Sequence, residues 1–271
     1  MFSVLLSLYY KEDPMYLDQS LESIFSQTLR ADEIVLVEDG PLTPELYAVV
    51  NMYKKAYPEL KLVALEKNNG LGMALNEGLR FCSYDLVVRA DTDDICKPDR
   101  FEKLISYMVD HPEIDVCSSS IDEFEGDKDN VVSIRQLPQE HKDIFEFGKR
   151  RNPINHPASV FRKSAVEKVG GYQHFPLFED YYLWVRMLMN GAIFHNIEES
   201  LLYFRISLEM IKRRGGWKYA CTEMRFQKTM FSMGYISLLT MLTNLSLRFG
   251  VRILPNGARS FVYSKFLRKN H

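Results

Sequence analysis

DLVVRADTDD, residues 85–94, passes from a short apolar run directly into three closely spaced carboxylates. The apolar part predicts a buried strand over Asp85–Arg89, and Asp91–Asp94 follow at its C-terminal end. Neighbouring carboxylates repel one another and gain nothing from burial. A divalent cation relieves that repulsion, and Mg²⁺ and Mn²⁺ both take oxygen ligands of this kind. The alternative interpretation is a solvated turn whose aspartates cap the helix expected from Pro98.

Strands and helices alternate on both sides of this stretch. Strands are expected at Ser3–Leu8, Glu33–Val37 and Lys61–Leu65, and helices from Pro14, from Pro44, over Leu71–Phe81 and over Pro98–Val109. Such alternation predicts an α/β fold with a Rossmann-like, mostly parallel central sheet and helices on both faces. Ligands of such sheets bind outside the carboxyl ends of the strands. Asp39 and Asp91–Asp94 both follow strands, so the two acidic loops are expected to line one crevice.

The pattern is mixed after about residue 112. Strands are expected at Ile114–Ser119 and Val131–Arg135, a loop with a short strand at Asn152–Phe161, and a helix over Phe178–Asn190. We therefore expect one domain over residues 1–220, with a nucleotide-binding half (1–112) and an acceptor half (113–220). A helical, basic extension is expected over residues 221–271.

Charge is distributed unevenly, although the whole chain carries only −2. Residues 201–271 hold 13 Lys or Arg against Glu209 and Glu223, a net charge of +11, whereas residues 1–200 hold 21 basic and 34 acidic groups. The basic residues of the tail are interleaved with Leu and Phe at helical spacing. That spacing favours anionic lipid over a nucleic-acid backbone, so no nucleic acid is expected as a partner.

The tail is expected to form a helix from about Met230. On one face lie Phe231, Tyr235, Leu238, Leu242, Leu245 and Phe249, and on another Thr240, Asn244, Arg248 and Arg252. Two interpretations stay open: a helix that lies in a membrane interface, and an ordinary helix that packs on the domain. No apolar run reaches 18 residues, which predicts no membrane-spanning helix. Four scattered cysteines fit a reducing, cytoplasmic setting.

Several short motifs follow one another along nearly the whole chain. They are Ser3–Tyr10, Val37-Glu38-Asp39-Gly40, Asn69-Gly70-x-Gly72, Arg89–Asp94, Asn155-His156-Pro157, Val169–Tyr172, Phe178–Tyr181 and Lys212–Trp217. In this order and spacing they resemble the family 2 glycosyltransferases with the GT-A fold. The ending, Lys212–Trp217, resembles the exopolysaccharide and O-antigen branch, including amylovoran-type transferases.

The resemblance implies roles for individual residues on the donor side. Asp39 resembles the aspartate that hydrogen-bonds the nucleobase, with Ser7 and Tyr9 lining the same pocket. Gly72 sits where the backbone approaches the donor, although a glycine at a helix start can equally serve a turn. Asp91 resembles the residue that touches the ribose or sugar, and Asp93 the ligand of an Mn²⁺ or Mg²⁺ ion that bridges the diphosphate.

The acceptor side carries fewer matches. Asp180 resembles the catalytic base of the family's Glu-Asp motif, although Glu179 and Asp180 can also simply stabilise a helix N-terminus. His156 could lie near the acceptor or be structural. Arg213 and Arg214 could hold a diphosphate or form a solvated basic face.

Together these features predict an inverting, metal-dependent glycosyltransferase for bacterial surface polysaccharide. The resemblance implies UDP-glucose or UDP-galactose as donor, and a lipid-diphosphate-linked sugar as acceptor at the inner face of the cytoplasmic membrane. A non-catalytic nucleotide-sugar-binding or membrane-docking module is the alternative. A sugar-1-phosphate nucleotidyltransferase is disfavoured, because Leu8–Asp13 after the first strand contains no glycine.

Overall fold

The computed structural model describes residues 1–206 and 216–253. Its first 90 residues alternate as expected between strand and helix. In chain order the elements are β1 (Ser3–Leu8), α1 (Pro14–Phe25), β2 (Glu33–Glu38), α2 (Pro44–Ala56), β3 (Leu60–Ala64), α3 (Leu71–Phe81) and β4 (Leu86–Arg89). The two predicted helix starts are confirmed: Asp13 Oδ1 accepts from Met15 N at 2.8 Å, and Thr43 Oγ1 accepts from Leu46 N at 3.3 Å.

The second half contains more elements than the sequence pattern predicts. They are β5 (Ile95–Cys96), α4 (Arg100–Asp110), β6 (Val116–Phe124), β7 (Val131–Arg135), α5 (His141–Gly148), the short helix η1 (His156–Ala158), β8 (Val160–Arg162), α6 (Lys163–Lys168), α7 (Glu179–Met189), β9 (Phe194–Arg205), α9 (Trp217–Ser232) and α10 (Leu238–Ile253). The strand expected at Ile114–Ser119 continues to Phe124. The long strand β9 was not predicted.

One sheet unites the strands in the order β3-β2-β1-β4-β8-β6-β9-β5, with β7 added at β6. The pairs among β1 to β4 are parallel, and β6 and β9 are parallel to each other. The short strand β8 runs antiparallel to both β4 and β6 and joins the two parts. The predicted mostly parallel sheet is therefore confirmed, with antiparallel pairs at β5, β7 and β8.

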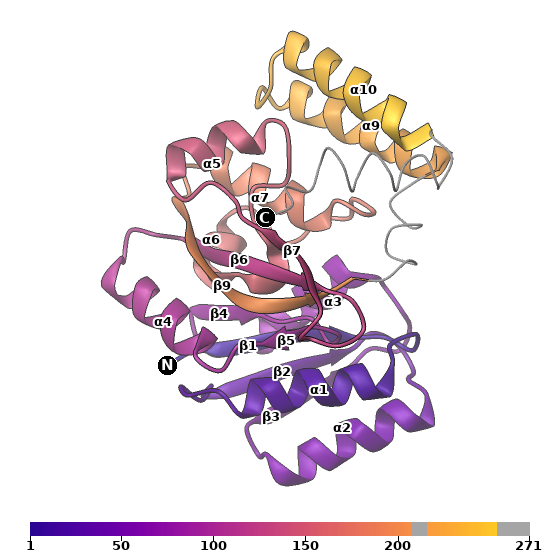
Figure 1. Cartoon of the computed structure of the whole chain (residues 1–271), viewed down its shortest axis with the longest axis vertical. Helices are drawn as coiled ribbons and strands as arrows, with labels where there is room; N and C mark the ends of the chain where they lie inside the picture. Colours follow the sequence, from indigo (N-terminus) through magenta and orange to yellow (C-terminus); the bar gives the residue numbers. More distant parts are fainter. Residues whose placement is uncertain (207–215, 254–271) are drawn as a thin grey trace.

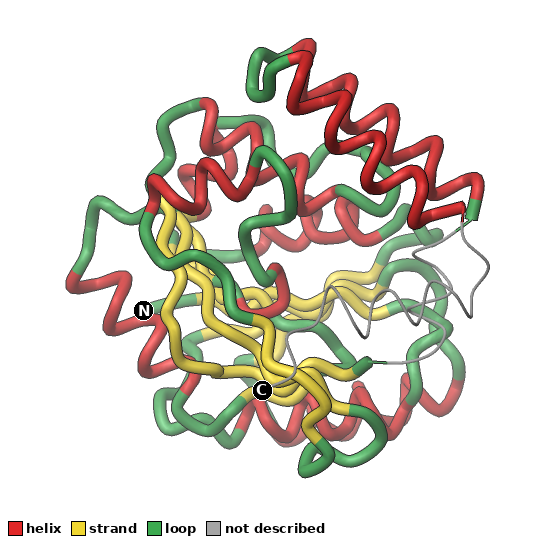
Figure 2. Tube along the Cα trace, turned by 45° about the horizontal axis from the view of Figure 1, so that its top comes forward, coloured by secondary structure: helices red, strands yellow, loops and turns green. Residues whose placement is uncertain are grey.

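Helices cover both faces of the sheet (Figures 1 and 2). Successive side chains of a strand point to opposite faces, and β1 feeds two separate cores. Val4, Leu6 and Leu8 pack with α1, α2 and α4, whereas Leu5 packs with α3 and α7. Phe226 of α9 belongs to this second core. The carboxyl ends of β1, β2 and β4 meet at one edge, which is where the acidic loops leave the sheet.

The single helix expected from Met230 is wrong. The chain instead forms a helical hairpin of α9 and α10, broken at Gly234, whose φ of 80° is a conformation that favours glycine. Tyr235 is buried and Phe231 is exposed, so they do not share a face. Asn244, predicted to share a face with Thr240 and two arginines, is buried. The side chains of Arg248, Phe249 and Arg252 lie outside the described residues.

Gly78 marks the tightest helix-to-sheet contact of α3. A Cβ atom built there would lie 2.4 Å from Leu5 Cδ1 and 2.6 Å from Val37 Cγ2. We predict that Gly78→Ala lowers the free energy of unfolding by about 1–3 kcal/mol, because overpacking outweighs the better helix propensity of alanine. Urea unfolding measures the loss. Leu5→Val combined with Gly78→Ala should lose less than the sum of the single variants, and strict additivity would contradict the contact.

Candidate active site

Three carboxylates gather in the loop between β4 and β5. Oxygen atoms of Asp91, Asp93 and Asp94 all lie within 4.8 Å of one another. Asp94 is buried, and its Oδ1 accepts from the backbone N of Arg205 at 2.8 Å. Among the described residues, no group donates to Asp94 Oδ2. An orphaned buried oxygen beside two further carboxylates fits a positively charged ligand.

The electrostatics of this loop favour the same ligand. Burial, together with the charges of Asp91 and Glu12, raises the pKa of Asp93 to about 7. Burial and the charge of Asp93 raise the pKa of Asp94 well above its ordinary value. These groups are expensive to ionise without a counter-charge. A hard divalent cation such as Mn²⁺ or Mg²⁺ supplies that charge, so the residues present fit such an ion.

Arg205, at the end of β9, fixes the loop from outside. Its Nε donates to the Asp93 carbonyl at 2.9 Å, and one terminal nitrogen donates to Gln19 Oε1 at 2.7 Å. Its guanidinium carbon lies 3.8 Å from the Tyr16 ring centroid and 4.6 Å from that of Phe124. The loop is therefore held to α1, β6 and β9 at once. Sequence reasoning missed Arg205, because its partner lies 112 positions away and no local motif contains it.

A second arginine, Arg89 at the end of β4, fixes the loop to the sheet. Arg89 is completely buried, forms an ion pair with Asp91 and donates to the carbonyl of Ala90. It also donates to the Leu5 carbonyl on β1 at 3.3 Å. A buried guanidinium requires such partners, since unpaired buried charge is costly. Arg89 therefore fixes the Asp91 carboxylate relative to the sheet, a role that its place in the motif did not reveal.

Asp39 leaves the neighbouring strand end at the same edge. Its Oδ1 accepts from Asn69 N at 2.7 Å and its Oδ2 from Gly70 N at 3.0 Å, so the carboxylate orders the loop before α3. Each oxygen keeps a further lone pair. Ser7 and Tyr9 are half-buried at the end of β1, and Asp39 N donates to the Leu8 carbonyl between them at 2.7 Å. The three predicted nucleobase residues thus share one strand edge.

Gly72 and Glu179 bring the two halves of the chain into contact. A Cβ atom on Gly72 would lie 3.1 Å from Glu179 Cγ, so α3 and α7 begin side by side. Glu179 and Asp180 are half-buried in the first turn of α7, and burial raises the pKa of Glu179, as does the charge of Asp180. Asn152 Nδ2 donates to Asp180 Oδ2 at 2.6 Å. Asn152 was also missed from the sequence, because nothing near it predicts this contact.

His156 is part of the core. It is 6% exposed, its Nε2 lies 2.8 Å from the Tyr172 hydroxyl, and its ring packs edge-on to Trp184. Burial lowers the pKa of His156 well below its ordinary value. Burial also raises the pKa of Tyr172, and the charges of Asp180 and Asp91 both add to that rise. The pKa of Tyr172 therefore depends on the charges of both the acidic loop and Asp180 of α7. Arg213 and Arg214 lie outside the described residues.

Comparison with known proteins places this geometry in context. The family model "Glycosyl transferase family 2" matches residues 3–170. The chain is 40% identical over 268 residues to UDP-Gal:alpha-D-GlcNAc-diphosphoundecaprenol beta-1,3-galactosyltransferase of Escherichia coli, covering 99% of this chain and 97% of that protein. It is 42% identical over 265 residues to the amylovoran biosynthesis glycosyltransferase AmsE of Erwinia amylovora, covering 98% of both.

A solved structure shows the same fold. The chain resembles the crystal structure of S. aureus TarS 1-349 in complex with UDP-GlcNAc, with a TM-score of 0.66 and 16% identity. The match covers 99% of this chain and 76% of that one. At this identity the likeness concerns the fold alone, and it confirms the GT-A architecture expected from the sequence.

The buried His156 generates a pH-dependent prediction. The native state leaves the imidazole neutral, whereas the unfolded chain binds a proton below about pH 6.5, so stability falls with falling pH. We predict that His156→Gln, which can still reach the Tyr172 hydroxyl, loses less stability than wild type between pH 7 and 5, by roughly 2 kcal/mol. Urea unfolding at each pH measures this. The exposed His174→Gln serves as control, and parallel curves for wild type and His156→Gln would contradict the assignment.

Proposed function

The chain belongs to glycosyltransferase family 2, in its exopolysaccharide and O-antigen branch, and from this premise we propose a specific reaction. We propose that it is a metal-dependent, inverting hexosyltransferase. Its donor is UDP-glucose or UDP-galactose, and its acceptor is a lipid-diphosphate-linked sugar of a bacterial surface polysaccharide. The observation that carries the proposal is the contact between the start of α3 and the start of α7, in which Gly72 of the donor side meets Glu179 beside Asp180.

The donor is assigned to the edge formed by β1, β2 and β4. Asp39, with Ser7 and Tyr9, receives the nucleobase, and Asp91 contacts the ribose or the sugar. Asp93 would ligate a divalent cation, and carboxylate oxygens of Asp91, Asp93 and Asp94 lie within 4.8 Å of one another. When bound, this ion neutralises the charge that develops on the departing nucleoside diphosphate. Arg89 and Arg205 hold the carboxylates in place while that charge changes.

The acceptor is assigned to the side of α7. Asp180 takes the proton of the attacking hydroxyl, as the acceptor oxygen forms a bond to the anomeric carbon and the bond from that carbon to the diphosphate breaks. Direct displacement of this kind inverts the configuration. Asn152 orients the base through the 2.6 Å hydrogen bond that its Nδ2 donates to Asp180 Oδ2. A module that only binds nucleotide sugars has no use for such a base, so turnover separates the two hypotheses.

A lipid-linked acceptor requires that the transfer take place at a membrane surface. We propose that α10 contacts the cytoplasmic face of the bilayer. Four of its leucines are exposed: Leu238, Leu239, Leu242 and Leu247. The polar Asn244 instead faces inward and donates to Gln227 Oε1 and to the Lys149 carbonyl, each at 2.9 Å. The helix thus leaves these four leucines exposed, while Met241 packs against the second core. Among the described residues, no helix is both long and apolar enough to cross a bilayer.

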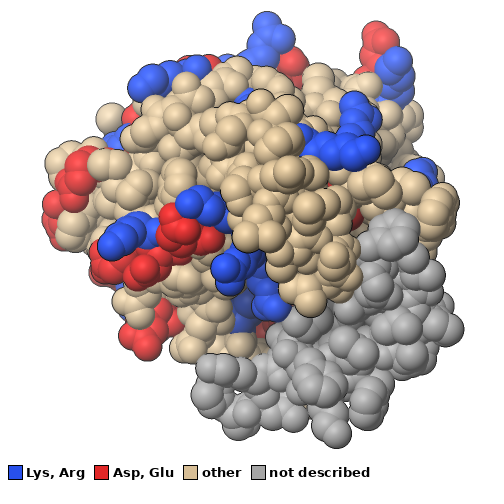
Figure 3. All heavy atoms as spheres, turned by 90° about the horizontal axis from the view of Figure 1, so that it is seen from above, with Lys and Arg blue, Asp and Glu red and all other residues tan. Residues whose placement is uncertain are grey.

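The surface around the hairpin agrees with this orientation. Figure 3 looks down on this side of the molecule, where a broad area carries neither acidic nor basic side chains, and both Lys or Arg and Asp or Glu side chains lie at its edges. Residues 248–271 add six basic and no acidic residues in sequence. Apolar side chains that enter a bilayer, flanked by cations that attract anionic headgroups, are the usual means of peripheral attachment.

The catalytic assignment makes a first prediction. Asp93→Ala and Asp180→Asn should each lower kcat at least 100-fold with Mn²⁺ present, because one removes a ligand of the cation and the other the base. Release of UDP, with and without the lipid-linked acceptor, measures turnover. Asp110→Asn on the exposed end of α4 serves as a matched control and should keep wild-type rates. Wild-type turnover in both site variants would end the proposal.

The membrane assignment makes a second prediction. Replacing Leu239, Leu242 and Leu247 together by serine should reduce binding to vesicles that contain phosphatidylglycerol at least tenfold, since each inserted leucine contributes roughly 1.5–3 kcal/mol. Co-sedimentation measures the bound fraction. Met52→Ser, at an exposed apolar position of α2, controls for the loss of surface apolar area and should bind like wild type. Undiminished binding of the triple variant would exclude α10 as the contact.

A further inference from the structure

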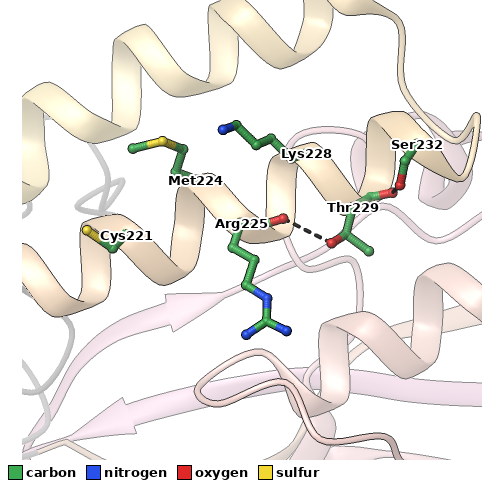
Figure 4. A pocket seen from close by; sticks show the side chains of 6 residues that line it. All are labelled: Cys221, Met224, Arg225, Lys228, Thr229 and Ser232. Atoms are coloured by element: carbon green, nitrogen blue, oxygen red, sulfur yellow. Dashed lines mark hydrogen bonds between the residues drawn. The ribbon is translucent and has the colours of Figure 1, made fainter.

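A shallow groove follows the solvent-facing side of α9. It has a volume of about 420 Å³ and lies outside the catalytic residues assigned above. The side chains that line it come from successive turns of this one helix: Cys221, Met224, Arg225, Lys228, Thr229 and Ser232. In Figure 4, Lys228 and Met224 point toward α10, whereas Arg225 points away from it, so the two cations flank the groove.

The groove carries two positive charges that can reach a ligand in solvent. Arg225 and Lys228 are exposed, and no carboxylate of the described residues forms an ion pair with either. The acid nearest in sequence, Glu223, is buried on the other side of α9. The hydroxyls of Thr229 and Ser232 donate to carbonyls of their own helix, at 3.0 and 2.8 Å. Two unpaired cations with an apolar edge fit an anionic group attached to an apolar chain.

Aromatic packing fixes this groove relative to the proposed base. The Arg225 guanidinium carbon lies 5.5 Å from the Phe175 ring centroid. The next residue, Phe226, stacks on Phe178 at 4.9 Å, and Phe178 is the residue that directly precedes Glu179 and Asp180. Phe175 itself packs on Phe226 at 5.2 Å. A single aromatic layer therefore separates the groove from the start of α7, and the layer is buried and cannot shift independently.

We propose that Arg225 and Lys228 bind the diphosphate of the lipid-linked acceptor. This inference rests on the proposed function and deepens it by assigning a site to the acceptor's charged group. The acceptor sugar then extends from the groove toward the start of α7, which holds Asp180. Its lipid extends in the opposite direction, toward the exposed leucines of α10, which packs against α9. Guanidinium and ammonium groups hold a diphosphate through charge-assisted hydrogen bonds.

The test compares two acceptors that differ only in the diphosphate. One carries the sugar on an alkyl diphosphate, and the other carries the same sugar directly on the same alkyl chain. Arg225→Gln with Lys228→Gln should raise KM for the diphosphate acceptor at least tenfold, while kcat and the KM for UDP-sugar stay within about twofold. With the phosphate-free acceptor the double variant should equal wild type. Lys218→Gln removes a charge from the same helix outside the groove and should change neither KM.

A binding measurement separates the groove from catalysis. Titration of the full chain with an alkyl diphosphate, without donor, should give at least tenfold weaker binding to the double variant than to wild type. Equal binding, or a KM change that is the same for both acceptors, overturns the groove assignment. A double variant that loses binding to phosphatidylglycerol vesicles but keeps alkyl diphosphate binding shows a headgroup contact instead, which also overturns it. If the wild-type protein binds the alkyl diphosphate but turns over neither acceptor, the result contradicts the proposed function and leaves the groove assignment intact.

Discussion

Burial of the Asp94 carboxylate beside the half-buried Asp93 is the constraint on which the rest of the site depends. Two like charges in a dry loop are costly, and the chain offsets this cost only in part, through the backbone N of Arg205 on one side and the Arg89 pair with Asp91 on the other. A loop left short of positive charge fits a cation. The same burial fixes the carboxylates in one geometry, so the proposed ion would be positioned before reaction begins.

The architecture extends this constraint across the molecule. β8 runs antiparallel between β4 and β6 and so places the second half of the chain beside the acidic loop. Arg205, at the C-terminal end of β9, contacts that loop by donating a hydrogen bond to the Asp93 carbonyl. Meanwhile α7 begins against Gly72, which brings Asp180 to the same edge from the opposite face. Tyr172 lies between these parts, which is why the charges of Asp91 and Asp180 both affect its hydroxyl. The site is thus assembled from long-range contacts on a rigid sheet.

Sequence reasoning succeeded where structure is decided locally. The Asp13 and Thr43 caps, the apolar runs of β1, β2 and β4 and the acidic loop after β4 each carry their own signal within ten residues. It failed for β9, whose middle holds Glu198 and Glu199 and whose pairing with β6 shifts register twice. Arg205 and Asn152 act only through partners distant in sequence. Their roles follow from topology, which periodicity does not encode.

The C-terminal hairpin shows why amphipathic pattern alone cannot assign a helix face. Asn244 and the leucines of α10 have the expected spacing, yet Asn244 faces the domain, because it donates hydrogen bonds to Gln227 Oε1 and the Lys149 carbonyl there. Once a polar residue finds buried partners, the apolar residues opposite must face outward. That reversal is costly in water and favourable only beside another apolar phase. The proposed acceptor gives a physical reason for this orientation of α10. Its diphosphate must reach Arg225 while its lipid tail stays in the bilayer.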